Sequence, residues 1–318
     1  MAHIISTKTI VCDNGLFYRS IYAINDMVII GGRDGSIKIW NIKTHKCINT
    51  LNDHDETIFS VFATNDYIIS ASGDHTIKIW DIMNGTLLNT MRGHTCYVYC
   101  VCVINNYIIS GSSDHTIKIW DINTGKLINT LHGHTFEIMS ICAINNYIVS
   151  GDDNGLIKIW DINTYECIKT LIGHTITVYT VVATDDYIFS GSYDTDIIIW
   201  DIHTGKCLKK LIGHKRAVWD IFFANNIIIS HSWDDTIKLW DMNSGTNIKT
   251  IAIDTTFGIS SIFANNKYII NPTNNMIKIY EYITNKQIFT ILICMWKLDY
   301  PTEIIHEILF YLNINNYA

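Results

Sequence analysis

Histidine, serine and aspartate recur in this sequence at a fixed spacing, and these residue types can form a nucleophilic or metal-binding centre. In each copy a tryptophan follows them. The complete sets are His54, Ser70, Asp74 and Trp80; His94, Ser110, Asp114 and Trp120; His174, Ser190, Asp194 and Trp200; and His214, Ser230, Asp234 and Trp240. Because each copy of about 40 residues has one set, the sets cannot converge on a single centre. The pattern predicts one buried hydrogen-bond chain per copy, with a structural role.

Three further copies depart from this pattern. One has His134, Ser150 and Trp160, but Asn154 at the position of the aspartate. An amide keeps a hydrogen-bond acceptor and loses the charge that strengthens a bond to histidine, so we expect a weaker chain in this copy. The first copy has Asn14, Ile30, Asp34 and Trp40, and the seventh has Asp254, Ile270, Asn274 and Tyr280. Both terminal copies lack the histidine and the serine, so we expect fraying to begin there.

Other catalytic and metal-binding signals are missing from the sequence. It has no phosphate-binding glycine loop, no Gly-x-Ser-x-Gly motif and no zinc-spaced cluster. Nine cysteines include no CxxC pair, and Cys47, Cys167 and Cys207 share one repeat position, which suggests interchangeable packing residues. We therefore predict no catalytic residue, metal or cofactor. Catalysis by residues that converge at the mouth of a central channel stays as an alternative.

Composition limits the classes of partner. The chain has 318 residues, 48% of them hydrophobic, and a formal net charge of −7, which disfavours general binding to nucleic acid. No segment approaches the roughly 18 apolar residues of a membrane span, and no signal peptide is recognisable. We expect a cytosolic or nuclear protein that binds neither nucleic acid nor membrane.

The elements that must position the recurring residues are short strands. In one copy the runs Val98–Val103, Tyr107–Ser110, Thr116–Trp120 and Leu127–Leu131 are rich in β-branched and aromatic residues and separated by Asn, Asp and Gly. Tryptophans recur every 40 residues from Trp40 to Trp240, and Tyr280 takes the seventh position. Radial repetition of four-stranded antiparallel sheets predicts an all-β, seven-bladed β-propeller over residues 1–293.

Gly-His pairs ending at His94, His134, His174 and His214 and Trp-Asp pairs such as Trp120-Asp121 resemble those of the WD-repeat family. The resemblance covers residues 14–293. It implies that each set of histidine, serine, aspartate and tryptophan is the structural tetrad of that family. It also implies a protein-interaction scaffold whose partners bind on the top face of the propeller.

The family resemblance places three positions of each repeat on the top face, and many of these are aromatic here. In the first copy they include Arg19 and Arg33. The candidate partner-binding residues are Phe59, Tyr97, Tyr99, Glu137, Asp153, Tyr179, Tyr193, Trp219 and Trp233. Aromatic rings beside two carboxylates suit a lysine or arginine side chain, so we expect a basic peptide ligand. The alternative is that the rings fill the channel or pack against the next blade.

Closure of the ring has two candidate strands. Residues 286–292 match the outer-strand pattern of the earlier copies, and residues 4–11 could compete for the same place. Because residues 4–11 fit the apolar register less well, residues 286–292 are the favoured strand.

The period stops after Trp296, and residues 297–318 form a tail of another kind. Ile304, Ile308 and Leu312 share one helical stripe, and Pro301 suits a helix start, so we expect a short C-terminal α-helix. The tail resembles the opening of an F-box, which implies an adaptor of cullin-type ubiquitin ligases as partner and a substrate-receptor function. The alternative is an amphipathic helix that packs on the propeller or lies free.

Overall fold

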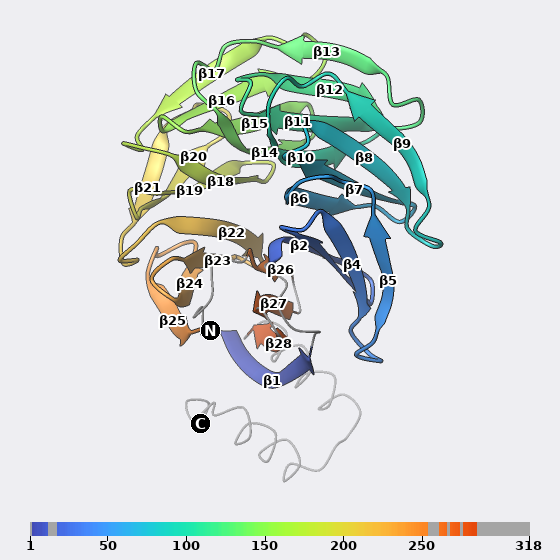
Figure 1. The fold of residues 1–318 in the computed structure, drawn as a ribbon. Coiled ribbons are helices and arrows are strands. Elements are labelled where there is room, and N and C mark those ends of the chain that lie inside the picture. Colours follow the sequence, from blue (N-terminus) through green and yellow to red (C-terminus); the bar gives the residue numbers. More distant parts are fainter. Residues whose placement is uncertain (1, 12–17, 254–260, 266–267, 274–275, 285–318) are drawn as a thin grey trace, which may run out of the picture.

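The computed structural model describes residues 2–11, 18–253, 261–265, 268–273 and 276–284, and these form seven four-stranded antiparallel sheets arranged as the blades of a ring (Figure 1). The predicted seven-bladed β-propeller is therefore confirmed. The predicted helix and residues 297–318 lie outside the described residues. Within the described residues, no helix is long and apolar enough to cross a membrane.

Each of the first six blades uses four consecutive strands, ordered from the channel to the rim. Blade 1 contains β2 (Tyr18–Ile24), β3 (Met27–Gly32), β4 (Ser36–Asn41) and β5 (Cys47–Asn52). Blade 2 contains β6 (Ile58–Ala63), β7 (Tyr67–Ser72), β8 (Thr76–Asp81) and β9 (Leu87–Arg92). Blade 3 contains β10 (Val98–Ile104), β11 (Tyr107–Ser112), β12 (Ile117–Asp121) and β13 (Leu127–Leu131).

The next three blades repeat this plan. Blade 4 contains β14 (Ile138–Ile144), β15 (Tyr147–Asp152), β16 (Leu156–Asp161) and β17 (Cys167–Ile172). Blade 5 contains β18 (Val178–Ala183), β19 (Tyr187–Ser192), β20 (Ile197–Asp201) and β21 (Cys207–Leu211). Blade 6 contains β22 (Val218–Ala224), β23 (Ile227–Ser232), β24 (Thr236–Asp241) and β25 (Asn247–Ala252).

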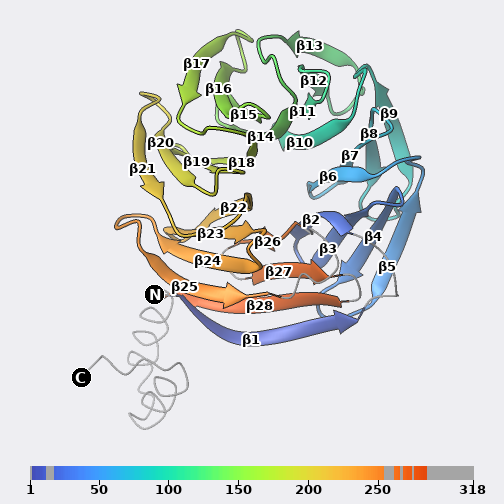
Figure 2. The same ribbon diagram turned by 60° about the vertical axis from the view of Figure 1, so that its left-hand side comes forward.

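Blade 7 combines the two ends of the chain. It contains β26 (Phe263–Ala264), β27 (Tyr268–Thr273), β28 (Met276–Thr284) and, at the rim, β1 (Ala2–Val11). β1 pairs antiparallel with β28, with Ile10 opposite Ile277 (Figure 2). The preference for residues 286–292 was therefore wrong: an edge strand accepts one neighbour on its free side, and β1 holds that place. Residues 286–292 lie outside the described residues.

The hydrophobic core lies between the blades. Ile37 and Leu51 of blade 1 pack in one cluster with Val61, Ile68 and Trp80 of blade 2, and comparable clusters join later blades. A four-stranded sheet buries only the faces that meet a neighbouring sheet, so the closed ring is the unit that excludes water. The top face is the end of the ring formed by two loops of each blade. One loop leads into the inner strand, and the other joins the second strand to the third.

Candidate binding site on the top face

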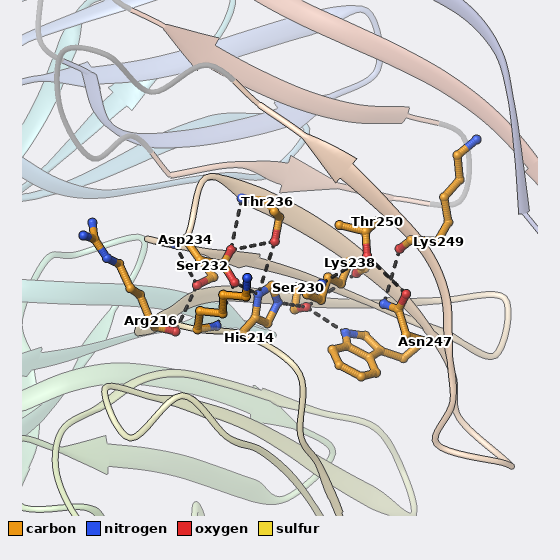
Figure 3. Close-up of polar contacts among 12 residues, drawn as sticks. His214, Arg216, Ser230, Ser232, Asp234, Thr236, Lys238, Asn247, Lys249 and Thr250 are labelled. Atoms are coloured by element: carbon orange, nitrogen blue, oxygen red, sulfur yellow. Dashed lines mark hydrogen bonds and ion pairs between the residues drawn. The ribbon is translucent and has the colours of Figure 1, made fainter.

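Tetrads hold the top of blades 2 to 6 in place. In blade 6, His214 Nε2 lies 2.7 Å from Ser230 Oγ, and His214 Nδ1 lies 2.9 Å from Asp234 Oδ2 (Figure 3). Trp240 Nε1 donates to the same serine oxygen at 2.8 Å. The same three contacts are present in the sets that begin at His54, His94 and His174.

The aspartate of each tetrad also shapes the turn that carries the top face. Asp234 Oδ1 accepts from the backbone N–H and the hydroxyl of Thr236, and Oδ2 accepts from the backbone N–H of Lys215. Burial alone would raise the pKa of Asp234, but these hydrogen bonds and His214 lower it to about 2. Each of these carboxylates is thus engaged in structure, and the tetrad histidines and serines are buried.

Blade 4 keeps the carboxylate but takes it from a different residue. His134 Nδ1 lies 2.8 Å from Asp152 Oδ2, and His134 Nε2 lies 2.7 Å from Ser150 Oγ. The expectation that Asn154 replaces the aspartate was therefore wrong. The last residue of β15 reaches the histidine, because a carboxylate two residues earlier can point into the same buried space.

The terminal blades lack complete tetrads. Trp40 Nε1 is buried and has no hydrogen-bond partner among the described residues, because Ile30 stands where other blades have the serine. Among the described residues, Asp34 accepts hydrogen bonds from the backbone N–H and the hydroxyl of Ser36 alone. Asn14, Asp254 and Asn274 lie outside the described residues.

A repeated β-bulge aims one side chain per blade at the mouth of the channel. The inner strands of blades 1–6 each contain one extra residue relative to the neighbouring strand. A bulge redirects the side chain of the extra residue, which would otherwise follow the alternation of the strand. These residues are Arg19, Phe59, Tyr99, Met139, Tyr179 and Trp219, and all six line the channel cavity.

Four of the predicted partner-binding residues form one aromatic cluster, here called the Trp219 cluster: Tyr179, Tyr193, Trp219 and Trp233. The ring centroids of Tyr179 and Trp219 lie 4.4 Å apart, and Trp219 stacks on Trp233 at 5.3 Å. Tyr193 lies 6.0 Å from Trp233 and is 47% exposed. The indole N–H of Trp233 is buried without a hydrogen-bond partner among the described residues.

Three more predicted residues form a second cluster on blades 2 and 3, here called the Tyr97 cluster: Phe59, Tyr97 and Tyr99. The ring centroid of Phe59 lies 4.9 Å from that of Tyr99 and 6.0 Å from that of Tyr97. Tyr97 is 45% exposed and also contacts the His75 ring. The structure thus groups the predicted aromatic residues into two clusters that flank the channel.

Arg19 joins the two clusters. Its guanidinium carbon lies 4.7 Å from the ring centroid of Trp219 and 5.6 Å from that of Phe59. Burial and the positive charge of Arg33 lower the pKa of Arg19, while Tyr179 and Asp220 oppose this. Arg19 occupies one of the predicted top-face positions, but it was not among the residues predicted to bind partners. The sequence signal for it was a cation at a position where most other copies have an aromatic residue.

The two predicted acidic residues lie beside these rings. Asp153 is exposed, and its carboxylate accepts a hydrogen bond from the hydroxyl of Thr177 at 2.7 Å. Burial and the Glu137 carboxylate raise the pKa of Tyr99 to about 12. Burial and Asp153 likewise raise the pKa of Tyr179. Each cluster therefore has a carboxylate next to one of its tyrosines.

Below the clusters lies a channel cavity of about 310 Å³. Tyr22 packs against Phe62 and Phe263 at 4.7 and 5.2 Å, and Phe263 contacts Phe222, so aromatic rings also line this part of the cavity. Four rings of the two clusters, Phe59, Tyr99, Tyr179 and Trp219, line the same cavity, so part of the alternative interpretation holds for them, whereas Tyr97 and Tyr193 point to solvent.

Blade 6 carries a buried polar pair that no sequence pattern indicated. Asp220 faces His231 across the sheet, and His231 Nδ1 lies 3.6 Å from the Asp220 carboxylate. The carboxylate also accepts from the backbone N–H of Ile262 in blade 7. Earlier blades have glycine or alanine at the position of His231. The pair therefore links blades 6 and 7 at the channel.

Cysteines do not add a metal site to the described part of the chain. Cys47, Cys167 and Cys207 are exposed on outer strands, so their interpretation as packing residues was wrong. An outer strand has a free face toward solvent, and these positions lie there. No group of three His, Cys, Asp or Glu side chains among the described residues is arranged to hold a metal ion.

The closed ring of four-stranded blades with histidine–serine–tryptophan chains defines a WD-type β-propeller. The family model of the WD domain, G-beta repeat (WD40), matches residues 45–81, 85–121, 125–161, 165–201 and 205–241. The chain belongs to the WD40 repeat family.

Comparison with solved structures agrees with this fold. The crystal structure of the computationally designed Ika8 protein is similar to this chain, with a TM-score of 0.69 and 24% sequence identity over 88% of this chain and 99% of that chain. At this identity the similarity shows the fold alone. A search of curated proteins gave no match.

Proposed function

We propose that this protein is a non-catalytic scaffold that binds partner proteins or peptides on the top face of its propeller. The WD40 propeller is typical of protein-interaction scaffolds. The observation that carries the proposal is the pair of aromatic clusters on this face, each with one ring about half exposed, Tyr97 and Tyr193. Large rings on a rigid frame supply contact area at a low cost in conformational entropy.

The ligand that fits the clusters best is a peptide with basic side chains. Glu137 and Asp153 provide negative charge next to Tyr99 and Tyr179. A lysine or arginine side chain can contact an aromatic face and a carboxylate at once. The tetrad carboxylates cannot serve this purpose, because they are already bonded to histidine and to the turn.

The test compares capture of partners by the wild-type protein and a Tyr97→Ala, Tyr193→Ala double variant. Both side chains are exposed, so their loss leaves the fold intact. The matched control is Met83→Ala, which removes a side chain that is 86% exposed at the opposite end of blade 2. Loss of the main partners with the double variant alone supports the proposal. Equal capture by all three proteins contradicts it.

The basic character of the ligand has a separate test. Fluorescently labelled peptides that are matched in length and carry either lysine and arginine or glutamate are titrated with wild-type protein and with an Asp153→Asn variant. We expect the basic peptides to bind more tightly and Asp153→Asn to weaken them. Preference for the acidic peptides contradicts this part of the proposal.

A second function rests on the sequence of the tail. Residues 297–318 lie outside the described residues, and their resemblance to the opening of an F-box favours a substrate receptor of a cullin-type ubiquitin ligase. The test is capture with a protein that ends at Trp296. Loss of a cullin adaptor with this truncation supports the receptor function, and absence of any adaptor from the full chain contradicts it.

A further inference from the structure

We infer that the mouth of the channel is a binding site for an arginine side chain, which the chain fills with its own Arg19 until an arginine of a partner replaces it. The inference deepens the proposed function and rests on it, because the partner's arginine arrives at the top face. Arg19 then competes with the partner's arginine for the same rings. The site prefers arginine to lysine.

The position of Arg19 is the first observation. Its guanidinium carbon lies over the rings of Trp219 from blade 6 and Phe59 from blade 2, at 4.7 and 5.6 Å from their centroids. A planar guanidinium stacks on aromatic faces, whereas an ammonium group is a more strongly hydrated point charge. Rings from two separate blades therefore form a site with the shape of a guanidinium.

The contacts that hold Arg19 are the second observation. Its guanidinium forms no hydrogen bond or ion pair with any described residue. Burial and the charge of Arg33 both disfavour its protonated form. A guanidinium that keeps its ring contacts but lacks acceptors is held more weakly than one in a bidentate pair. Among the described residues, an incoming arginine competes with these ring contacts and with the attraction that Asp220 and Tyr179 exert on Arg19.

The attachment of Arg19 is the third observation. It is the extra residue of the bulge between Tyr18 and Ser20, whose neighbours pair with β3. The backbone is fixed in the sheet, and the side chain alone must swing away for a partner to enter. At the equivalent positions of the other copies the sequence has only uncharged residues, namely Phe59, Tyr99, Met139, Tyr179, Trp219 and Ile259. Arg19 is thus the one positively charged residue at this position of the seven copies.

The experiment removes the internal arginine and supplies a small substitute. Methylguanidinium is titrated into wild-type protein and an Arg19→Ala variant, and the indole N–H signals of the tryptophans are followed by NMR. We expect saturable binding that is about tenfold or more tighter in Arg19→Ala, as contact with two rings would give. Methylammonium should not show this gain.

Two variants locate the effect. Arg33→Ala removes the neighbouring positive charge but leaves Arg19 in place, so it should show a much smaller gain than Arg19→Ala. Arg19→Ala combined with Trp219→Leu should lose the gain. Arg19→Thr, whose β-branched side chain suits a strand and is too short to reach the rings, replaces Arg19→Ala if the alanine variant unfolds. Equal binding by wild type and either Arg19 variant, or an equal gain in Arg33→Ala, overturns the inference.

This result is independent of the partner test. If Arg19→Ala gains methylguanidinium but the Tyr97 and Tyr193 variants keep every partner, the arginine site stands and the proposed function fails. If those variants lose their partners and Arg19→Ala gains nothing, the proposed function stands and the arginine site fails.

Discussion

The Nδ1 atom of His134 lies 2.8 Å from Oδ2 of Asp152, and both side chains are completely buried. In the four complete tetrads the carboxylate follows the histidine by 20 residues, whereas here it follows by 18. Asp152 also accepts from the backbone N–H groups of Asn154 and Leu156. Asp152 thus bonds both the histidine and the turn, as the turn aspartate does in the four complete tetrads.

Replacement of this carboxylate should destabilise the protein. Asp152→Ser introduces the residue that blades 2, 3, 5 and 6 have at this position and leaves His134 without its acceptor. We expect a loss of about 1–3 kcal/mol in the free energy of unfolding, measured with urea. A second change, Asn154→Asp, recreates the pattern of the other blades and should restore most of the loss. No rescue by Asn154→Asp would show that the two positions are not interchangeable.

The indole hydrogen bond can be isolated by comparing two tryptophans. Trp80 Nε1 donates to Ser70 Oγ at 2.9 Å, whereas Trp40 Nε1 has no partner among the described residues. Both rings are buried, so Trp→Phe removes a similar apolar area from each. We expect Trp80→Phe to cost about 1–3 kcal/mol more than Trp40→Phe, because it removes the N–H donor to the buried Ser70 Oγ. If both variants lose the same free energy of unfolding in urea, the hydrogen bond of the indole N–H does not contribute to stability.

Acid should weaken the propeller in two stages. Burial lowers the pKa of His94 and His214, so below about pH 6.5 the unfolded chain takes up protons that the folded protein does not, and stability falls. Burial alone would raise the pKa of Asp194, but bonds to His174 and the turn lower it to about 2. Its contribution is present above about pH 4 and disappears as the pH falls toward 2.

Urea midpoints at pH 8, 5 and 3 measure these stages. Asp194→Asn should lower stability at pH 8 and reduce the further drop between pH 5 and 3. Asp185→Asn changes an exposed aspartate of the same blade and serves as the control. If Asp194→Asn leaves the drop between pH 5 and 3 unchanged, the low pKa of Asp194 is not a source of acid sensitivity.

The contribution of β1 to ring closure should come from the side chains on its buried face. Ile10 is 1% exposed and packs with residues of blades 1 and 7, while Val11 is 75% exposed. We expect Ile10→Ala to cost about 2–5 kcal/mol through the cavity it leaves. Val11→Ala should change the free energy of unfolding by about 0.5 kcal/mol or less. Thermal or urea unfolding separates the two, and similar effects would argue against β1 as a packed closing strand.

Much of the fold could be predicted because its signals are local. The predicted run Leu127–Leu131 is β13 without change, and Val98–Val103 differs from β10 by one residue. Strand alternation, turn residues and the tryptophan period can all be read within one copy of about 40 residues. The four strands of each copy can therefore be predicted from that copy alone. The members of four tetrads follow from the same spacing.

Features that depend on distant segments were not predictable in the same way. The choice of β1 over residues 286–292 joins the two ends of the chain, and no pattern inside one repeat encodes that pairing. Asp152 replaces Asn154 because the buried space near His134 can be reached from two positions, and only the packed structure shows which side chain occupies it.

The amino-acid sequence by itself determined the number of blades, the strands of most blades and the residue types at the top face, because these follow from a repeated local pattern. The tertiary structure decided which aromatic residues meet and that Arg19 lies between Trp219 and Phe59. Phe59 and Trp219 are 160 positions apart in the chain. They share one cation because ring closure brings the bulges of separate blades around a single channel.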